Sequence, residues 1–114
     1  MYKRQVEEFL ILPEPEKNSE PSWFGFPLTL KKNNQYSRQN IIKYLSDSKI
    51  GTRLLFSGNL IKQPYMKNIN FKVHGDLKNT DLVMENTFWV GLYPGLREKH
   101  LDYTVNKILN FFKI

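Results

Sequence analysis

The sequence predicts an α+β fold: a small three-stranded sheet with helices packed on one face. Strand-like and helix-like segments follow one another in the order strand, helix, strand, short helix, strand, helix. This order gives a small sheet whose apolar face is covered by helices. With 114 residues, 14% of them aromatic, the chain is long enough for one domain with an ordinary core.

The first 21 residues are predicted to lead into the domain. Residues 1–12 are interpreted as the end of a helix, over 1–9, followed by a short extended run. Residues 13–21 contain three prolines, which forbid regular structure, so we interpret them as an exposed connector. The small α/β domain is therefore placed at residues 22–114.

The first strand is expected within residues 22–30. Alternate residues from Phe24 to Leu30 are apolar and should share one face. Pro27 removes one backbone donor, which disfavours a central position over that half of the strand. Gly25 indicates a close approach of another group to the backbone, or a bulge.

A helix is predicted from Ser37 to about Lys49, with Ser37 as its N-cap and Gly51 as the left-handed residue that ends it. The second strand follows at Thr52–Phe56, whose β-branched, apolar and aromatic residues are typical of a short buried strand.

The remaining elements complete the sheet and its cover. A short helical turn broken at Pro64 is expected first, then a short helix over about 80–86 with Asn79 or Thr80 as its cap. The near-continuous apolar run at residues 87–93 is predicted to be the most buried strand. The last helix is expected over about 97–112.

Arg53 is the strongest candidate for a functional residue. It is the one guanidinium in an apolar strand, and an arginine is costly to bury without a partner. The following Ser57-Gly58-Asn59 turns easily and carries hydrogen-bonding groups. The planar fork of an arginine can hold a carboxylate or phosphate through two hydrogen bonds. The alternative is an arginine at a strand edge that pairs with a surface acid.

Composition excludes several function classes. The absence of cysteine excludes disulfides, thiolate metal sites and a cysteine nucleophile within this chain. His74 and His100 lie far apart, so a zinc site is not expected. No apolar run approaches the ~20 residues of a membrane span, and no signal peptide is recognised. We therefore expect a soluble, cytoplasmic protein. The net charge of +6 favours anionic partners and leaves nucleotides, nucleic acid and acidic proteins open.

The run Trp23-Phe24-Gly25-Phe26 could act as a base-stacking platform like that of an RNA-recognition motif. Ser22 and Pro27 depart from that motif, and aromatic residues in strands more often belong to the core. No glycine-rich phosphate loop and no convincing acid–base pair is present. The residues alone therefore assemble no catalytic apparatus.

Five ordered stretches carry a resemblance to a known family. They are Glu8–Pro13, Pro21–Pro27, Thr52–Asn59 with Gln63-Pro64, Gly75–Leu77 and Asn86–Leu96. Over residues 7–112 the chain resembles the C-terminal domain of the CDP-4-keto-6-deoxy-D-glucose 3-dehydrases of lipopolysaccharide (O-antigen) biosynthesis. These enzymes belong to the DegT/DnrJ/StrS sugar aminotransferase family of fold-type I vitamin B6 enzymes. Arg97 departs from the family pattern, where a threonine or serine cap is usual.

The resemblance implies a fragment of a larger enzyme, with a largely antiparallel sheet and the end of an interdomain helix at residues 1–12. A large N-terminal domain would carry the pyridoxamine or pyridoxal phosphate (PMP/PLP) site and the cysteines of a [2Fe-2S] cluster. The fragment would then hold no catalytic, cofactor-binding or metal-binding residue and would be inactive alone. The parent is expected to be a homodimer that works with an iron–sulfur flavin reductase, without nucleic acid or membrane partners.

The resemblance also implies that this domain forms one wall of the active-site cleft. The substrate-binding hypothesis assigns Arg53, Phe56, Ser57, Asn59 and Gln63 to a sugar nucleotide, with Arg53 at its diphosphate. The alternative for Arg53 is a purely structural role. Alternatives for the whole chain are the same domain of a PLP-dependent sugar aminotransferase, a basic RNA-binding module, or an interaction domain.

Overall fold

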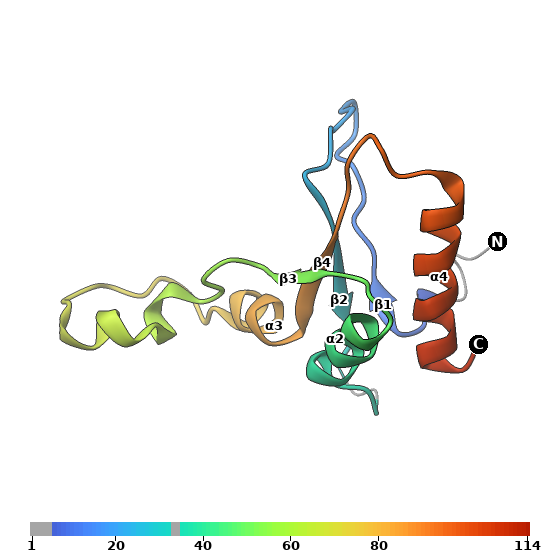
Figure 1. Cartoon of the computed structure of the whole chain (residues 1–114). Helices are drawn as coiled ribbons and strands as arrows, with labels where there is room; N and C mark the ends of the chain where they lie inside the picture. The colour runs from blue at the N-terminus through green and yellow to red at the C-terminus, as the bar shows by residue number, and fades with distance from the viewer. Residues whose placement is uncertain (1–5, 33–34) are drawn as a thin grey trace.

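The computed structural model describes residues 6–32 and 35–114 and contains one antiparallel sheet with the strand order β1-β2-β4-β3 (Figure 1). The strands are β1 (Leu10–Ile11), β2 (Gly25–Leu30), β3 (Thr52–Leu54) and β4 (Thr87–Gly91). The predicted α+β class is confirmed. The sheet has four strands instead of three, because Leu10 and Ile11 pair with the end of β2.

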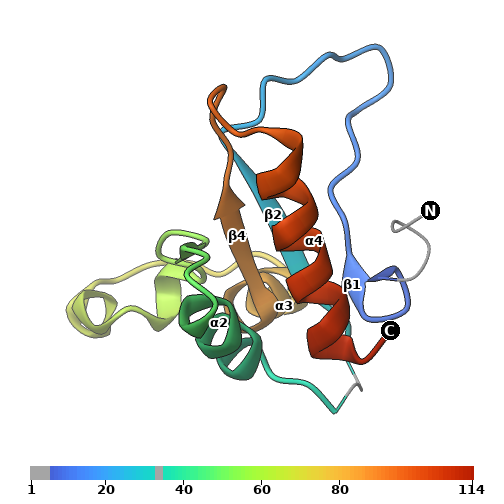
Figure 2. The same ribbon diagram turned by 45° about the vertical axis from the view of Figure 1, so that its right-hand side comes forward.

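The helices are α2 (Arg38–Asp47), α3 (Lys78–Asn86) and α4 (Glu98–Phe112), with two 3-10 turns, η1 (Leu60–Lys62) and η2 (Pro64–Asn68). Helices α2 and α4 pack against each other and against one face of the sheet (Figure 2). Helix α3 lies on the other side of the sheet and leads directly into β4 (Figure 1).

The core lies between the sheet and the pair α2 and α4. Strands β2 and β4 contribute Leu28, Leu30, Phe88 and Val90 from the residues that point to this face. The helices and the N-terminal segment supply the rest of the buried cluster: Val6, Leu10, Ile41, Leu45, Ile108, Leu109 and Phe112. The prediction that residues 87–93 form the most buried strand is borne out by β4, in which Thr87, Phe88 and Val90 are buried.

The prediction for the first helix holds at its start and fails at its end. Ser37 is the N-cap of α2, and its Oγ accepts a hydrogen bond from the backbone N–H of Asn40 at 3.2 Å. The left-handed residue after the helix is Lys49, with φ of 62°, and not Gly51. Because Ile50 N–H then bonds to Leu45 C=O, the chain has already left the helix before it reaches Gly51.

Two strand predictions need correction. Strand β3 is short and lies at the sheet edge, where Arg53 and Leu54 are exposed, so it is not a buried strand. Phe24 does not share the core face with Phe26: the chain bends at residue 24, and its ring, 77% exposed, contacts Trp89 instead. An apolar side chain stays exposed where no neighbouring element covers it.

The prediction for Pro27 is confirmed. Strand β1 pairs only with Leu30 and Thr29, so the half of β2 that contains Pro27 has a partner on the β4 side alone. Lys31 N–H bonds to Phe9 C=O on the β1 side, so the backbone nitrogen of Pro27, four residues earlier, faces the same side. No strand pairs there, so the missing N–H of Pro27 costs no hydrogen bond within the sheet.

Residues 55–77, which we call the arm, project away from the sheet and carry η1 and η2 (Figure 1). The predicted helical turn broken at Pro64 corresponds to these two 3-10 turns. Six large apolar side chains of the arm are about half exposed or more: Phe56, Leu60, Tyr65, Ile69, Phe71 and Val73. Helix α3 then begins at Lys78, two residues before the predicted start, because Asp76 Oδ1 accepts from Lys78 N–H at 3.1 Å.

The structure does not test the three predicted chain segments, which stay predictions. The helix expected over residues 1–9 falls largely on residues 1–5, which lie outside the described residues. Residues 12–23 contain no helix or strand.

Candidate functional site

Arg53 lies on the face of the sheet opposite α2 and α4. We call this side the open face, although α3 contacts β2 and β4. It stands directly opposite Trp89 in the β3–β4 register, and Pro27 stands opposite Trp89 on the other side. Its side chain is exposed, and among residues 6–32 and 35–114 no carboxylate pairs with it. The expected partner of the alternative interpretation, a surface acid, is therefore not found in the described part of the chain.

Trp89 is held flat across the sheet by its neighbours. Its indole N–H donates a hydrogen bond to the backbone oxygen of Leu54 in β3, at 3.2 Å. On the β2 side the ring lies over Gly25, where an added Cβ would come within 2.0 Å of Cε3. The prediction that Gly25 indicates a close approach to the backbone is confirmed. The indole is thus fixed from both sides.

The arm places three of the predicted substrate-binding residues at its base. Phe56 is 80% exposed and has a left-handed backbone, with φ of 47°. Ser57 follows, and its backbone oxygen accepts a hydrogen bond from Gln63 Nε2 at 2.6 Å. Gln63 thereby closes the turn between Ser57 and η1. Their role toward a substrate stays a prediction.

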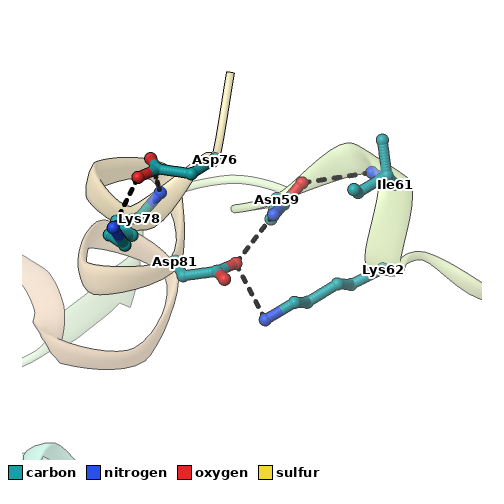
Figure 3. A network of polar contacts seen from close by, with 6 residues as sticks. All are labelled: Asn59, Ile61, Lys62, Asp76, Lys78 and Asp81. Atoms are coloured by element: carbon teal, nitrogen blue, oxygen red, sulfur yellow. Dashed lines mark hydrogen bonds and ion pairs between the residues drawn. The ribbon is translucent and has the colours of Figure 1, made fainter. Parts of the chain in front are cut away.

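Asn59 is used inside the fold (Figure 3). It is 2% exposed, its Oδ1 accepts from Ile61 N–H at 3.3 Å, and its Nδ2 donates to Asp81 Oδ1 at 2.7 Å. Lys62 Nζ approaches the same carboxylate oxygen at 2.8 Å. This network joins the base of the arm to α3. Both the oxygen and the nitrogen of the Asn59 side-chain amide therefore already have hydrogen-bond partners within the protein.

The network shifts the pKa values of its charged members. The hydrogen bond from Lys62, followed by that from Asn59, holds the pKa of Asp81 below its ordinary value. The hydrogen bond to Asp81 raises the pKa of Lys62. Next to them, the hydrogen bonds from Lys78 lower the pKa of Asp76 (Figure 3). All three shifts favour the charged forms, so the ion pair between Lys62 of the arm and Asp81 of α3 is present at neutral pH.

Two hollows lie elsewhere on the molecule. An open apolar groove of about 1210 Å³ runs between α4 and the core face of the sheet. Its lining includes Leu10, Phe26, Val90, Leu101, Val105 and Ile108. A polar hollow of about 400 Å³ lies at the start of α2, beside Arg38 and Glu85. Arg53 and the other predicted substrate-binding residues line neither hollow.

The chain offers little to an iron–sulfur cluster or metal ion. It has no cysteine, so it cannot supply thiolate ligands. In the part of the chain that the structure describes, no three His, Cys, Asp or Glu side chains gather at metal-binding distance. The same part contains no helix that is long and apolar enough to cross a membrane.

Sequence reasoning missed the pairing of Phe24 with Trp89. Their ring centroids lie 5.2 Å apart with an interplanar angle of 48°. The signal for the contact was Gly25, which indicated that something lies against the backbone there, but the sequence does not say what. The open face therefore brings Arg53, Trp89 and Phe24 to neighbouring positions. Of these, Arg53 was predicted to bind substrate, Phe24 was considered as part of a base-stacking run but assigned to the core, and Trp89 was not predicted as a site residue.

Comparison with known proteins gives a consistent result. The model of the DegT/DnrJ/EryC1/StrS aminotransferase family matches residues 1–109. The chain is 56% identical over 105 residues to the lipopolysaccharide biosynthesis protein RfbH of Salmonella typhimurium, covering 92% of the chain and 24% of that protein. It is 39% identical over 102 residues to a dTDP-4-dehydro-2,6-dideoxy-D-glucose 3-dehydratase of Saccharopolyspora spinosa, covering 90% of the chain and 22% of that enzyme.

Solved structures show the same fold. An Escherichia coli GDP-4-keto-6-deoxy-D-mannose-3-dehydratase with bound hydrated PLP superposes with a TM-score of 0.79 at 23% identity, over 93% of this chain and 28% of that one. The H188N mutant of such an enzyme with bound GDP-perosamine gives a TM-score of 0.80 at 23% identity, over 94% and 28%. The chain thus spans about a quarter of the length of the relatives it matches.

Proposed function

Because the chain belongs to the DegT/DnrJ/EryC1/StrS aminotransferase family, we propose that it forms the small domain of a vitamin B6-dependent sugar-nucleotide 3-dehydratase. One observation carries the proposal. An enzyme named for 3-dehydration of a nucleoside-diphosphate sugar matches nine tenths of this chain at 39% identity. The reaction would be the removal of the C3 hydroxyl of a 4-keto-6-deoxyhexose in lipopolysaccharide (deoxysugar) biosynthesis.

The work is divided between this domain and the remainder of the enzyme. The vitamin B6 cofactor, PMP or PLP, supplies the electron sink for carbanion chemistry when bound, while the protein orients the substrate and excludes water. This chain has no residue group fitted to an iron–sulfur cluster, so the cluster that the resemblance implies would be ligated outside these 114 residues. A reductase partner, a homodimeric parent and a cytoplasmic location belong to the same proposal.

Arg53 is the residue of this chain proposed to bind the anionic part of the substrate. It is exposed on the open face of the sheet, and its guanidinium has no carboxylate partner among the described residues. A guanidinium of this kind can hold a diphosphate with two hydrogen bonds. The domain would thus position the sugar nucleotide while the remainder of the enzyme carries out the chemistry.

The test is an assay of the full-length polypeptide loaded with PMP. Its substrates would be 4-keto-6-deoxyhexoses linked to dTDP and GDP, for which the relatives are named, and to CDP, which the resemblance implies. Loss of water from C3, seen by mass spectrometry, supports the proposal. Amino transfer from glutamate to the sugar in a PLP-loaded sample, without dehydration, would instead identify a sugar aminotransferase and reject the dehydratase.

A further inference from the structure

We propose that the rings of Phe24 and Trp89, here called the stacking platform, bind the nucleobase of the sugar nucleotide. The inference deepens the proposed function, on which it rests for the identity of the ligand. It assigns a subsite to two neighbouring aromatic residues on the face that carries Arg53: Phe24, which is exposed, and Trp89, which is half-buried.

The first support is the fixed orientation of Trp89. The hydrogen bond to Leu54 and the close approach to Gly25 hold the indole against the sheet. A ring that is already immobile loses little conformational entropy when a planar ligand stacks on it. Trp89 is therefore prepared for stacking before any ligand arrives.

The second support is the exposure of Phe24. Its ring is 77% exposed, although the alternation along the strand would have placed it with Phe26 toward the core. It lies 5.2 Å from the indole at a tilt of 48°, so the two rings present neighbouring but not parallel surfaces. Proteins bind unpaired bases by stacking them on aromatic side chains, and the exposed ring of Phe24 offers such a surface.

The third support is open space next to the rings. Gly91 follows two residues after Trp89, on the same face, and pairs with Gly25. A Cβ at Gly91 would meet no atom within 4 Å, so no part of the described protein requires glycine there. A glycine with free space above it allows a ligand to approach the backbone closely.

The fourth support is charge. Arg53 stands next to Trp89 across the β3–β4 pair and is unpaired among the described residues. A covering apolar protein segment would bury this guanidinium without a partner, which costs free energy. A nucleoside diphosphate matches both features, since its base can stack on the rings while its phosphates meet the arginine. We therefore assign the face to a nucleotide and not to a protein segment.

The experiment measures binding to the full-length polypeptide by isothermal titration calorimetry. The probes are CDP, with dTDP and GDP titrated in parallel because the relatives are named for these nucleotides, inorganic pyrophosphate and a short single-stranded cytidylate RNA. Phe24→Ala is expected to raise the Kd for CDP by about 5- to 150-fold, the range that follows from losing one stacking contact. The Kd for pyrophosphate, which has no base, should stay within about twofold. Phe24→Tyr keeps a ring and should restore CDP binding.

A second variant and a control protect the result from folding artefacts. Gly91→Ala adds a methyl group in space that the protein leaves empty, so it should weaken CDP binding without loss of folded structure. Tyr65→Ala removes an aromatic side chain, 59% exposed, from the arm and should change neither Kd. Normal CDP binding in both Phe24→Ala and Gly91→Ala overturns the stacking platform, and so does an equal loss of CDP and pyrophosphate binding.

The outcomes separate this inference from the proposed function. If CDP binding depends on Phe24 but no 4-keto sugar is dehydrated, the dehydratase fails and the platform stands. If dehydration proceeds normally in Phe24→Ala with unchanged KM, the platform fails and the dehydratase stands. Binding of the RNA at 150 mM salt without binding of CDP, dTDP or GDP rejects the sugar nucleotide as the ligand, in favour of an RNA-binding role.

Discussion

The indole ring of Trp89 in β4 lies directly over Gly25 in β2, on the open face of the sheet. The indole of Trp89 fills the space in which any side chain at residue 25 would begin, with 2.0 Å between its Cε3 and an added Cβ. The same ring reaches across to Leu54 of β3 through its N–H. Trp89, which belongs to β4 itself, therefore contacts both neighbouring strands, β2 at Gly25 and β3 at Leu54.

Gly25→Ala is expected to destabilise the domain by about 1–3 kcal/mol, the usual cost of forcing an extra group into a filled space. The methyl group must displace the indole, which also breaks its hydrogen bond to Leu54. Urea unfolding of the 114-residue chain would measure the change. Gly91→Ala is the matched control, because its added methyl meets nothing within 4 Å and its φ is not positive. Equal stability of the two variants would contradict the proposed contact.

Asn59→Ala should loosen the arm while leaving the core intact. The substitution removes the amide that joins η1 to Asp81, and a lost hydrogen bond to a charged group costs about 1–3 kcal/mol. Limited digestion with trypsin is a direct readout, since Lys62, Lys67 and Lys72 lie in the arm. We expect faster cleavage there and unchanged cleavage of α2 at Lys43. Wild-type cleavage rates would show that Asn59 does not hold the arm.

The ion pair between Asp81 and Lys62 predicts a stability that depends on pH. Because the folded pKa of Asp81 is below its ordinary value of 3.8, its contribution is fully present above pH 3.8. It is lost as the pH falls through the lower folded pKa. Because the folded pKa of Lys62 is above 10.5, its contribution is present below pH 10.5 and disappears at more alkaline pH.

The corresponding measurement compares the wild type with Asp81→Asn by urea unfolding across pH. The difference in stability should be constant between about pH 5 and 9 and should shrink below pH 3.8. Asp47→Asn is the control, since Asp47 pairs with Lys43 on an exposed helix surface, where such pairs contribute little. A difference that persists unchanged at pH 2 would exclude the assigned role for Asp81.

Local signals in the sequence predicted the parts of the fold that depend on neighbours along the chain. Ser37 caps α2 because its hydroxyl oxygen accepts a hydrogen bond from the backbone N–H three residues later. This contact depends only on residues that are close in the sequence, so it could be predicted. The end of that helix was mispredicted, because Lys49 adopts the left-handed conformation two residues before the glycine. The start of α3 was also mispredicted, since the side chain of Asp76, and not that of Asn79 or Thr80, accepts a hydrogen bond from the backbone N–H of Lys78, the first residue of the helix.

Features that depend on distant contacts were less predictable. The composition of Thr52–Phe56 suits a buried strand, but burial is set by the position of β3 at the sheet edge, which composition does not encode. Phe24 was assigned to the core because it continues the alternation, whereas a bend before Gly25 turns it to the other face. Arg53 could be selected from the sequence, but its neighbour Trp89 is brought to it only by the register.

Arg53→Ala in the full-length enzyme should raise the KM for the sugar nucleotide or lower kcat by well over twofold. The expectation follows from the position of the guanidinium, which is exposed, next to Trp89 and unpaired in the described part of the chain.

Arg53→Lys keeps the charge but loses the planar fork, so it should recover only part of the activity if two hydrogen bonds hold the diphosphate. Lys43→Ala removes a cation from the surface of α2 and serves as the control. Steady-state kinetics, with urea unfolding of each variant, distinguish the two roles of Arg53: normal kinetics with reduced stability would assign it to the fold and remove it from substrate binding.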